Sequence, residues 1–229
     1  KTITIHIQDP KVNFKKFNYI VAPEHDDING NNIVTSTGAL HQFNDDIFSN
    51  ISEKNIDIPR KNLLSVIVGG GNNHYNFSLK EIDNLIIKIK NIKKINKKYN
   101  ILIIFSRRTT SEIKVLIKQK LNKEAIVWDT NQENPYTFSL KYSDYFIVTS
   151  DSTSMISECS FTGKPIYIFH LPFKRKSKRM ERFHQRFLRL NITKDLNSIS
   201  KLSPWTYEHL NESERISGII KERIIKEYS

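Results

Sequence analysis

The sequence has a single cysteine, Cys159, among its 229 residues. One cysteine excludes a framework of internal disulfides, and a cytoplasmic setting is the expectation that follows. No apolar run approaches the roughly 20 residues that a membrane-spanning helix needs, and the opening residues do not form a signal peptide. Zinc-type Cys and His spacings and an aromatic RNP signature are both missing. We therefore expect no metal site and no cofactor.

Negative charge is in short supply, with 36 Lys and Arg against 24 Asp and Glu, a net charge of +12. Such an excess is typical of nucleic-acid-binding proteins. Many of the lysines, however, are scattered through Asn- and Ile-rich helical patterns such as residues 86–98, which indicates solvated helix faces. We do not expect a nucleic-acid partner.

One segment, Lys174–Arg189, concentrates the positive charge, with eight Lys and Arg against one Glu. Met180, Phe183 and Phe187 share one helical face, so the segment predicts an amphipathic helix with a basic side. That side is either solvated or in contact with an acidic membrane surface, which would make the protein peripheral at a membrane.

Apolar runs and helical patterns alternate from residue 62 onward. Strands are predicted at Leu63–Val68, Ile101–Phe105, Ala125–Trp128, Tyr145–Thr149 and Pro165–Leu171. Near-continuous apolar runs suit strands that are covered on both faces. The sequence therefore predicts an α/β domain over residues 62–203, with a Rossmann-type parallel sheet and right-handed crossovers.

The rest of the chain divides into three pieces. Residues 1–43 alternate strands with polar loops, as in a partial Rossmann-like domain, and residues 44–61 are a polar linker. Glu212–Tyr228 is a helix with apolar Ile216 and Ile220 on one face. That face must be buried somewhere.

A polar hinge, Ser150-Asp151-Ser152, follows the strand Tyr145–Thr149 and begins a helix that runs to Phe161. Ligands of open α/β sheets bind at the carboxyl ends of strands, and helix N-termini attract anions. Glu158 lies about two turns along this helix, where its carboxylate could bind ribose hydroxyls. The alternative is that Asp151 or Ser152 only caps the helix and that Glu158 is solvated.

Two further strand ends carry phosphate-binding signals. Three glycines, Gly69–Gly71, let backbone N–H groups approach a phosphate, although a tight turn without a ligand explains them equally. Arg107 and Arg108 follow the next strand, and guanidinium groups bind phosphate oxygens in pairs.

His25 and Asp26, which follow a strand in the first part, are the candidate catalytic residues. A histidine beside carboxylates titrates near neutrality and suits acid–base chemistry. A surface turn is the competing interpretation.

The chain also resembles a known family in a series of short motifs that run nearly from end to end. They include HIQDP (His6–Pro10), APEHD (Ala22–Asp26), TGAL (Thr37–Leu40), VGGGN (Val68–Asn72), SRRT (Ser106–Thr109), NPY (Asn134–Tyr136), TSDSTSMISE (Thr149–Glu158), TGKP (Thr162–Pro165) and PWTY (Pro204–Tyr207). The family is the mitochondrial fission family known from a plant elongated-mitochondria phenotype, whose bacterial members are often labelled nucleoside-diphosphate-sugar epimerase-like.

This resemblance implies a GT-B glycosyltransferase-like fold, in which residues 1–43 are the C-terminal part of a truncated N-terminal domain and residues 204–229 pack back on that first part. It also implies a nucleotide-sugar donor, an unknown acceptor and a metal-independent glycosyl transfer. The implied donor-binding residues are Gly69, Gly70, Gly71, Asn72, Ser106, Arg107, Arg108, Thr109, Asp151, Ser152, Ser154, Met155 and Glu158. At Gly71 the chain departs from its relatives, which usually carry proline there. A non-catalytic adaptor and an epimerase-like enzyme are the alternatives on the same fold.

Overall fold

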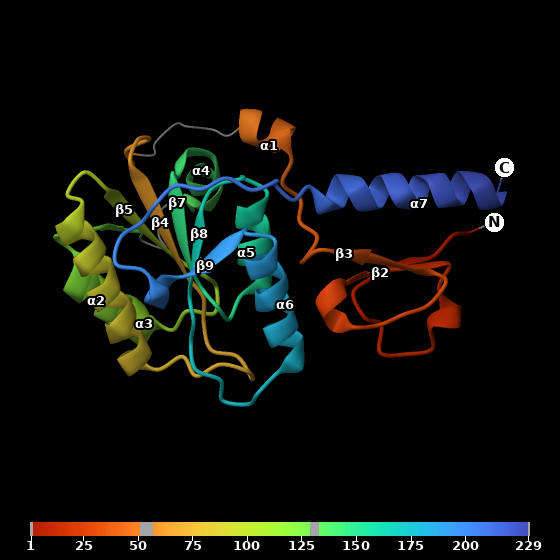
Figure 1. Ribbon diagram of the computed structural model, residues 1–229, viewed down its shortest axis with the longest axis horizontal. Helices are drawn as coiled ribbons and strands as arrows, with labels where there is room; N and C mark the ends of the chain where they lie inside the picture. The colour runs from red at the N-terminus through yellow and green to blue at the C-terminus, as the bar shows by residue number, and fades with distance from the viewer. Residues whose placement is uncertain (1, 51–56, 129–132, 229) are drawn as a thin grey trace.

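The computed structural model describes residues 2–50, 57–128 and 133–228, which contain two parallel sheets (Figure 1). The first sheet has the order β1-β2-β3 and contains β1 (Ile5–Ile7), β2 (Tyr19–Pro23) and β3 (Ile33–Ser36). The second has the order β6-β5-β4-β7-β8-β9 and contains β4 (Leu63–Val68), β5 (Asn100–Phe105), β6 (Ile126–Val127), β7 (Tyr145–Thr149), β8 (Ile166–Phe169) and β9 (Thr193–Asp195). All paired strands within these sheets are parallel, which confirms the predicted α/β class.

Helices connect the strands of the second sheet and cover both of its faces (Figure 1). They are α2 (Leu79–Ile95), α3 (Ser111–Leu121), α4 (Tyr136–Tyr142), α5 (Thr153–Ser160) and α6 (Lys178–Arg189). On β4, Leu64 and Val66 pack in one apolar cluster with α2 and α3, whereas Ile67 packs in another with α5 and α6. This alternation is what a strand with a period of two must show when both faces are covered.

The chain reverses direction across the second sheet at β4. It passes from β4 to β5 and β6 on one side and returns to β7, β8 and β9 on the other. The crevice at such a switch point, beyond the carboxyl ends of the strands, is where open α/β sheets bind ligands. A ligand-binding site is therefore expected at the loops that follow β4 and β7.

The last helix, α7 (Glu212–Tyr228), packs on the first sheet beside β3 (Figure 1). Ile216 and Ile220 lie in one cluster with Tyr19, Val21 and Val34. The Tyr19 hydroxyl also donates to Glu227 at 2.8 Å. We call this sheet, its loops and α7 the first unit, and the part from β4 to β9 the second unit.

The structure contains three features that the sequence patterns did not predict. The segment expected as a linker contains a short helix, α1 (Asp45–Ser49), and its residues 51–56 lie outside the described part. β9 is a polar edge strand of three residues, too short for a periodic signal. Single 3-10 turns occur at η1 (Phe14–Lys16), η2 (Glu24–Asp26) and η3 (Leu196–Ser198).

Gly38, in the loop after β3, contacts the second unit closely enough to require glycine. Its φ is +84°, and an added Cβ would lie 2.5 Å from Ser157 Oγ and 2.8 Å from Phe187 Cζ. Left-handed backbone costs a residue with a Cβ about 1–2 kcal/mol before any steric overlap is counted. The loop therefore fits between α5 and α6 only if residue 38 is a glycine.

We predict that Gly38→Ala lowers the free energy of unfolding by at least about 1–2 kcal/mol, measured by urea denaturation. Gly218→Ala is the matched control, because Gly218 is an exposed residue of α7 whose added Cβ meets nothing within 4 Å. It should raise the same free energy by about 0.5–1 kcal/mol, the usual gain of alanine over glycine in a helix. Equal effects of the two substitutions would contradict this account of the loop.

Candidate functional site

The carboxyl ends of β4, β5 and β7 are joined by one buried carboxylate, that of Asp151. Its side chain is 0% exposed. Its Oδ2 accepts the Gly70 N–H at 3.0 Å and an Arg108 Nη2–H at 3.2 Å, and its Oδ1 accepts the Thr149 hydroxyl at 2.6 Å. Thr149 Oγ1 in turn accepts the Gly69 N–H at 2.8 Å. Burial raises the pKa of Asp151, while the bonds from Thr149, Gly70 and Arg108 oppose the rise.

The glycine turn after β4 is built for close packing against the neighbouring loops. A Cβ on Gly69 would lie 2.2 Å from Asp151 Oδ2, and one on Gly70 would lie 2.2 Å from the Arg108 carbonyl oxygen. Neither position can hold a side chain. Gly71 differs, because a Cβ there meets nothing within 4 Å. The N–H groups of Gly69 and Gly70 bind within the protein rather than point to an open phosphate site.

The turn after β5 is held to the same edge by Thr109. Its hydroxyl lies 3.0 Å from the Val68 carbonyl oxygen and 2.5 Å from that of Gly69, and 3.2 Å from Ser106 Oγ. Arg108 forms an ion pair with Asp151. Arg107 is the other arginine predicted to bind phosphate. Both arginines are exposed, and the Arg108 side chain is still 45% exposed while it pairs with Asp151.

Asn72 ties the loop after β4 to the turn after β7. Its side-chain amide donates to the Asp151 carbonyl oxygen at 3.2 Å, and its Oδ1 accepts the N–H groups of His74 and Tyr75 at 2.8 and 2.9 Å. Asn72 thus shapes the loop. Met155, another residue of the predicted donor set, is half-buried and packs against the apolar cluster under α5.

The N-terminus of α5 has open backbone donors. Its N-cap, Ser152, makes no side-chain capping bond, and the Ser152 and Ser154 hydroxyls lie 3.4 Å apart. The N-caps of α2, α3 and α6 do accept such bonds from their own first turns. Ser152 is buried and Ser154 is exposed. Uncapped amides and the helix dipole favour an anion at this position.

Glu158 lies two turns along α5, and its Oε2 accepts the Tyr136 hydroxyl. The side chain is half-buried, and burial raises its pKa, opposed by the Tyr136 bond. Cys159 beside it is fully buried and packs in the apolar cluster, and burial raises its thiol pKa well above the usual value. Glu158 therefore lies further along α5 than the turn at its N-terminus, and its carboxylate is bonded to Tyr136.

His25 and Asp26 lie in η2, and η2 contacts α6. The His25 side chain is 4% exposed, and its ring meets the Phe183 ring edge-on at 5.2 Å between centroids. Asp26 pairs with Arg179. The His25 carbonyl oxygen accepts two bonds from the Arg182 guanidinium, at 2.9 and 3.2 Å. Burial, with Arg179 and Arg182 nearby, lowers the pKa of His25 to about 4, although Asp26 opposes the shift.

A second histidine, half-buried His184 of α6, supports the turn that leads into α5. Its Nε2 lies 3.0 Å from the Ser150 carbonyl oxygen and 3.1 Å from the Tyr75 hydroxyl. Burial lowers its pKa to about 3. The sequence patterns did not single out this residue for the site, and the Phe183-His184 pair was its only local signal.

Among the described residues there is no group of three or more His, Cys, Asp or Glu side chains that could hold a metal ion. The same residues include no helix that is both long and apolar enough to cross a membrane.

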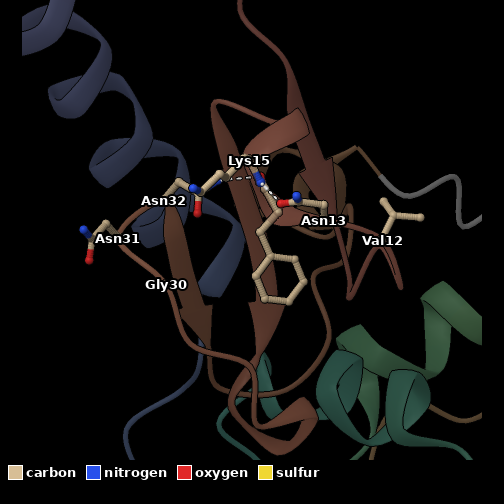
Figure 2. A pocket seen from close by; sticks show the side chains of 7 residues that line it. Val12, Asn13, Lys15, Gly30, Asn31 and Asn32 are labelled. Atoms are coloured by element: carbon tan, nitrogen blue, oxygen red, sulfur yellow. Dashed lines mark hydrogen bonds between the residues drawn. The ribbon is translucent and has the colours of Figure 1, made fainter.

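A separate hollow of about 580 Å³ lies at the other end of the first sheet, before β2 and β3 (Figure 2). Its lining includes Asn13, Lys15, Asn31 and Asn32. The Asn32 amide donates to the carbonyl oxygens of Phe14 and Phe17, both at 2.9 Å, and thereby holds the loops together. This hollow is at the amino ends of the strands, away from the edge where α/β ligands bind.

Comparisons with known proteins place the chain among relatives of one kind. A family model described as "Mitochondrial fission ELM1" matches residues 1–224. The uncharacterized protein RP120 of Rickettsia prowazekii is 31% identical over 221 residues, which cover 92% of this chain and 60% of that protein. The mitochondrial fission protein ELM1 of Arabidopsis thaliana is 22% identical, over 96% of this chain and 57% of its own length. The chain thus spans less than two thirds of these two relatives.

Among solved structures, the glycotransferase of kitacinnamycin matches 80% of this chain and 44% of its own, with 13% identity and a TM-score of 0.45. A likeness of that degree is too distant to carry a functional argument.

Removing the Asp151 carboxylate should loosen three loops together. We predict that Asp151→Ala lowers the free energy of unfolding by about 1–3 kcal/mol, because the Gly70 N–H and the Thr149 hydroxyl lose a buried acceptor. Asp83→Ala is the matched control, since Asp83 pairs with Lys120 at 2.7 Å on the surface. That loss should stay below about 1 kcal/mol. Urea titrations of both variants that gave the same loss would refute the central role of Asp151.

His25 and His184 predict a pH dependence of stability. Because the folded-state pKa values, about 4 for His25 and about 3 for His184, lie below the ordinary 6.5, the unfolded chain binds these protons first. The stabilisation is complete above about pH 6.5 and declines as the pH falls toward about 4, by about 1.4 kcal/mol per pH unit for each histidine.

Urea titrations between about pH 7 and pH 4 measure that slope. His25→Leu should make the slope shallower by up to about 1.4 kcal/mol per pH unit, because one contributing histidine is removed. Burial also lowers the pKa values of His41 and His170, so part of the slope should remain. A slope that is unchanged in the variant would show that His25 is protonated equally in both states.

Proposed function

Because the chain belongs to the mitochondrial fission ELM1 family, whose model spans residues 1–224, we propose that it binds a nucleotide sugar by its diphosphate at the N-terminus of α5. The observation that carries this proposal is the uncapped first turn of α5, which lies at the switch point of the second sheet. Diphosphates bind at such turns because free N–H groups and the helix dipole both favour negative charge.

The groups proposed to contact the diphosphate are few. They are the first-turn amides of α5, the hydroxyls of Ser152 and Ser154, and the Arg107 guanidinium, which is exposed beside this edge. Gly69, Gly70 and Asp151 act indirectly in this proposal, because the bonds from Gly69 to Thr149 and from Gly70 to Asp151 hold the turn after β4 against the turn after β7. Glu158, two helical turns further on, is proposed to bind the ribose hydroxyls.

The reaction proposed is glycosyl transfer to an acceptor hydroxyl. Departure of the nucleoside diphosphate is assisted when cationic side chains and a helix N-terminus stabilise the charge that develops on its oxygens. His25, with Asp26 beside it, is the proposed acid–base group, and its imidazole is neutral near neutral pH because its pKa is lowered to about 4. A general base increases the rate of such a reaction by a factor of about 10²–10⁴.

The binding step can be tested without knowing the acceptor. UDP-, GDP-, CMP- and ADP-sugars are screened by thermal shift, since a ligand at 100 Kd adds about 2.7 kcal/mol to the stability. For the donor that binds, we predict that Arg107→Ala weakens binding about 10- to 100-fold, the usual worth of a hydrogen bond to a charged group. The dissociation constant is measured by calorimetry.

Arg189→Ala is the control, because Arg189 is an equally charged, exposed residue at the far end of α6. Its dissociation constant should match that of the parent protein. If no nucleotide sugar shifts the melting temperature, the donor-binding proposal fails and the non-catalytic adaptor becomes the better hypothesis.

A further inference from the structure

The second unit meets the first unit through charged side chains along one side of α6. Each of three arginines pairs with a carboxylate in or next to η2. The pairs are Arg179 with Asp26, Arg182 with Asp27 at 3.2 Å, and Arg186 with Glu24 at 2.9 Å. Arginines spaced by three and four residues lie on one face of a helix, so the pairs form a ladder.

The ladder is sensitive to solvent because most of its members are only partly buried. The arginine side chains are between 39% and 45% exposed, and Asp26 at 6% is the buried carboxylate. Ion pairs exposed to this degree contribute between about 0 and 1 kcal/mol each, and dissolved salt screens them. Their contribution to holding the units together therefore falls as ionic strength rises.

A buried polar atom in the same contact works against it. His25 Nε2 has no hydrogen-bond partner among the described residues and lies 3.8 Å from Asp26 Oδ1. A buried polar group left unsatisfied costs about 1–3 kcal/mol. Separating η2 from α6 would let water reach this nitrogen, so the contact holds an opposing contribution that favours opening.

The loop after β3 supplies a second contact, which contains no charged pair. The Ala39 N–H donates to Ser157 Oγ at 3.0 Å, and Gly38 lies against Phe187. On its other side the loop is bound to α7, because the Thr37 N–H donates to Glu212 at 2.5 Å. This loop is thus anchored to both units, and the ladder can separate while the loop serves as a pivot.

We propose that the ladder between η2 and α6 is an electrostatic latch, which holds the two units together at low ionic strength and opens at high ionic strength to expose His25. The proposal does not depend on donor binding, because it uses only contacts between the units. Domains within one chain commonly move relative to one another, and the contact between η2 and α6 contains three ion pairs.

Energy transfer between two dyes measures the separation of the units. Lys16→Cys on the first unit and Lys123→Cys on the second give exposed labelling sites, whereas the native Cys159 is fully buried. Raising NaCl from about 0.01 M to 1 M shortens the Debye length from about 30 Å to about 3 Å. Transfer should fall over this range if the latch opens.

Charge substitutions separate the ladder from other effects of salt. Arg186→Glu should give low transfer even at about 0.01 M NaCl, and Glu24→Arg combined with Arg186→Glu should restore it by rebuilding the pair in reverse. Asp83→Lys with Lys120→Glu reverses a pair of the same kind inside the second unit and should leave transfer unchanged.

Arg186→Gln provides a neutral variant in case the charge reversal prevents folding, and circular dichroism confirms the fold of each protein. The latch is supported by a salt-dependent fall in transfer together with rescue by the reversed pair. It is overturned if transfer stays constant with salt, or if Arg186→Glu and Arg186→Gln behave as the parent. Failure of the reversed pair to restore transfer also overturns it.

Discussion

The buried carboxylate of Asp151 is the interaction on which the arrangement of the second unit's loops depends. It accepts bonds from the turn after β4, from an arginine in the turn after β5, and from the last residue of β7. A buried charge is tolerated only when it is paired and hydrogen-bonded, so these bonds must form together. Their joint formation holds three strand ends together at the edge from which α5 begins.

This arrangement separates residues that build the edge from residues that are free to bind. Glycines and arginines at strand ends are typical phosphate ligands, yet Gly69, Gly70 and Arg108 are bound within the protein. What stays available is the first turn of α5 with exposed Ser154, and exposed Arg107 in the turn after β5. His184 extends the support from α6, because it contacts the Ser150 carbonyl oxygen just before that turn.

The sequence predicted strands better than it predicted contacts. β4 and β7 have the predicted bounds, because continuous apolar runs between polar turns carry a strong local signal. β9 was missed, since three partly polar residues carry almost none. The position of the candidate site followed from strand ends, but the role of Asp151 did not. Its partners Arg108 and Gly70 lie 43 and 81 residues away, and no local pattern encodes such pairs.

The charge of α6 is a second example of contacts that a local sequence pattern does not predict. Its eight-to-one excess of basic residues, counted from Lys174 to Arg189, predicted a solvated or membrane-facing side. Three of those arginines pair with acids that lie more than 150 residues earlier in the chain, while their side chains stay 39% to 45% exposed. A net charge of +12 thus overstates how much positive charge this helix offers to a partner while the two units are in contact. Separation of η2 from α6 would return that charge to the surface, so the partners available to α6 depend on how the two units are arranged.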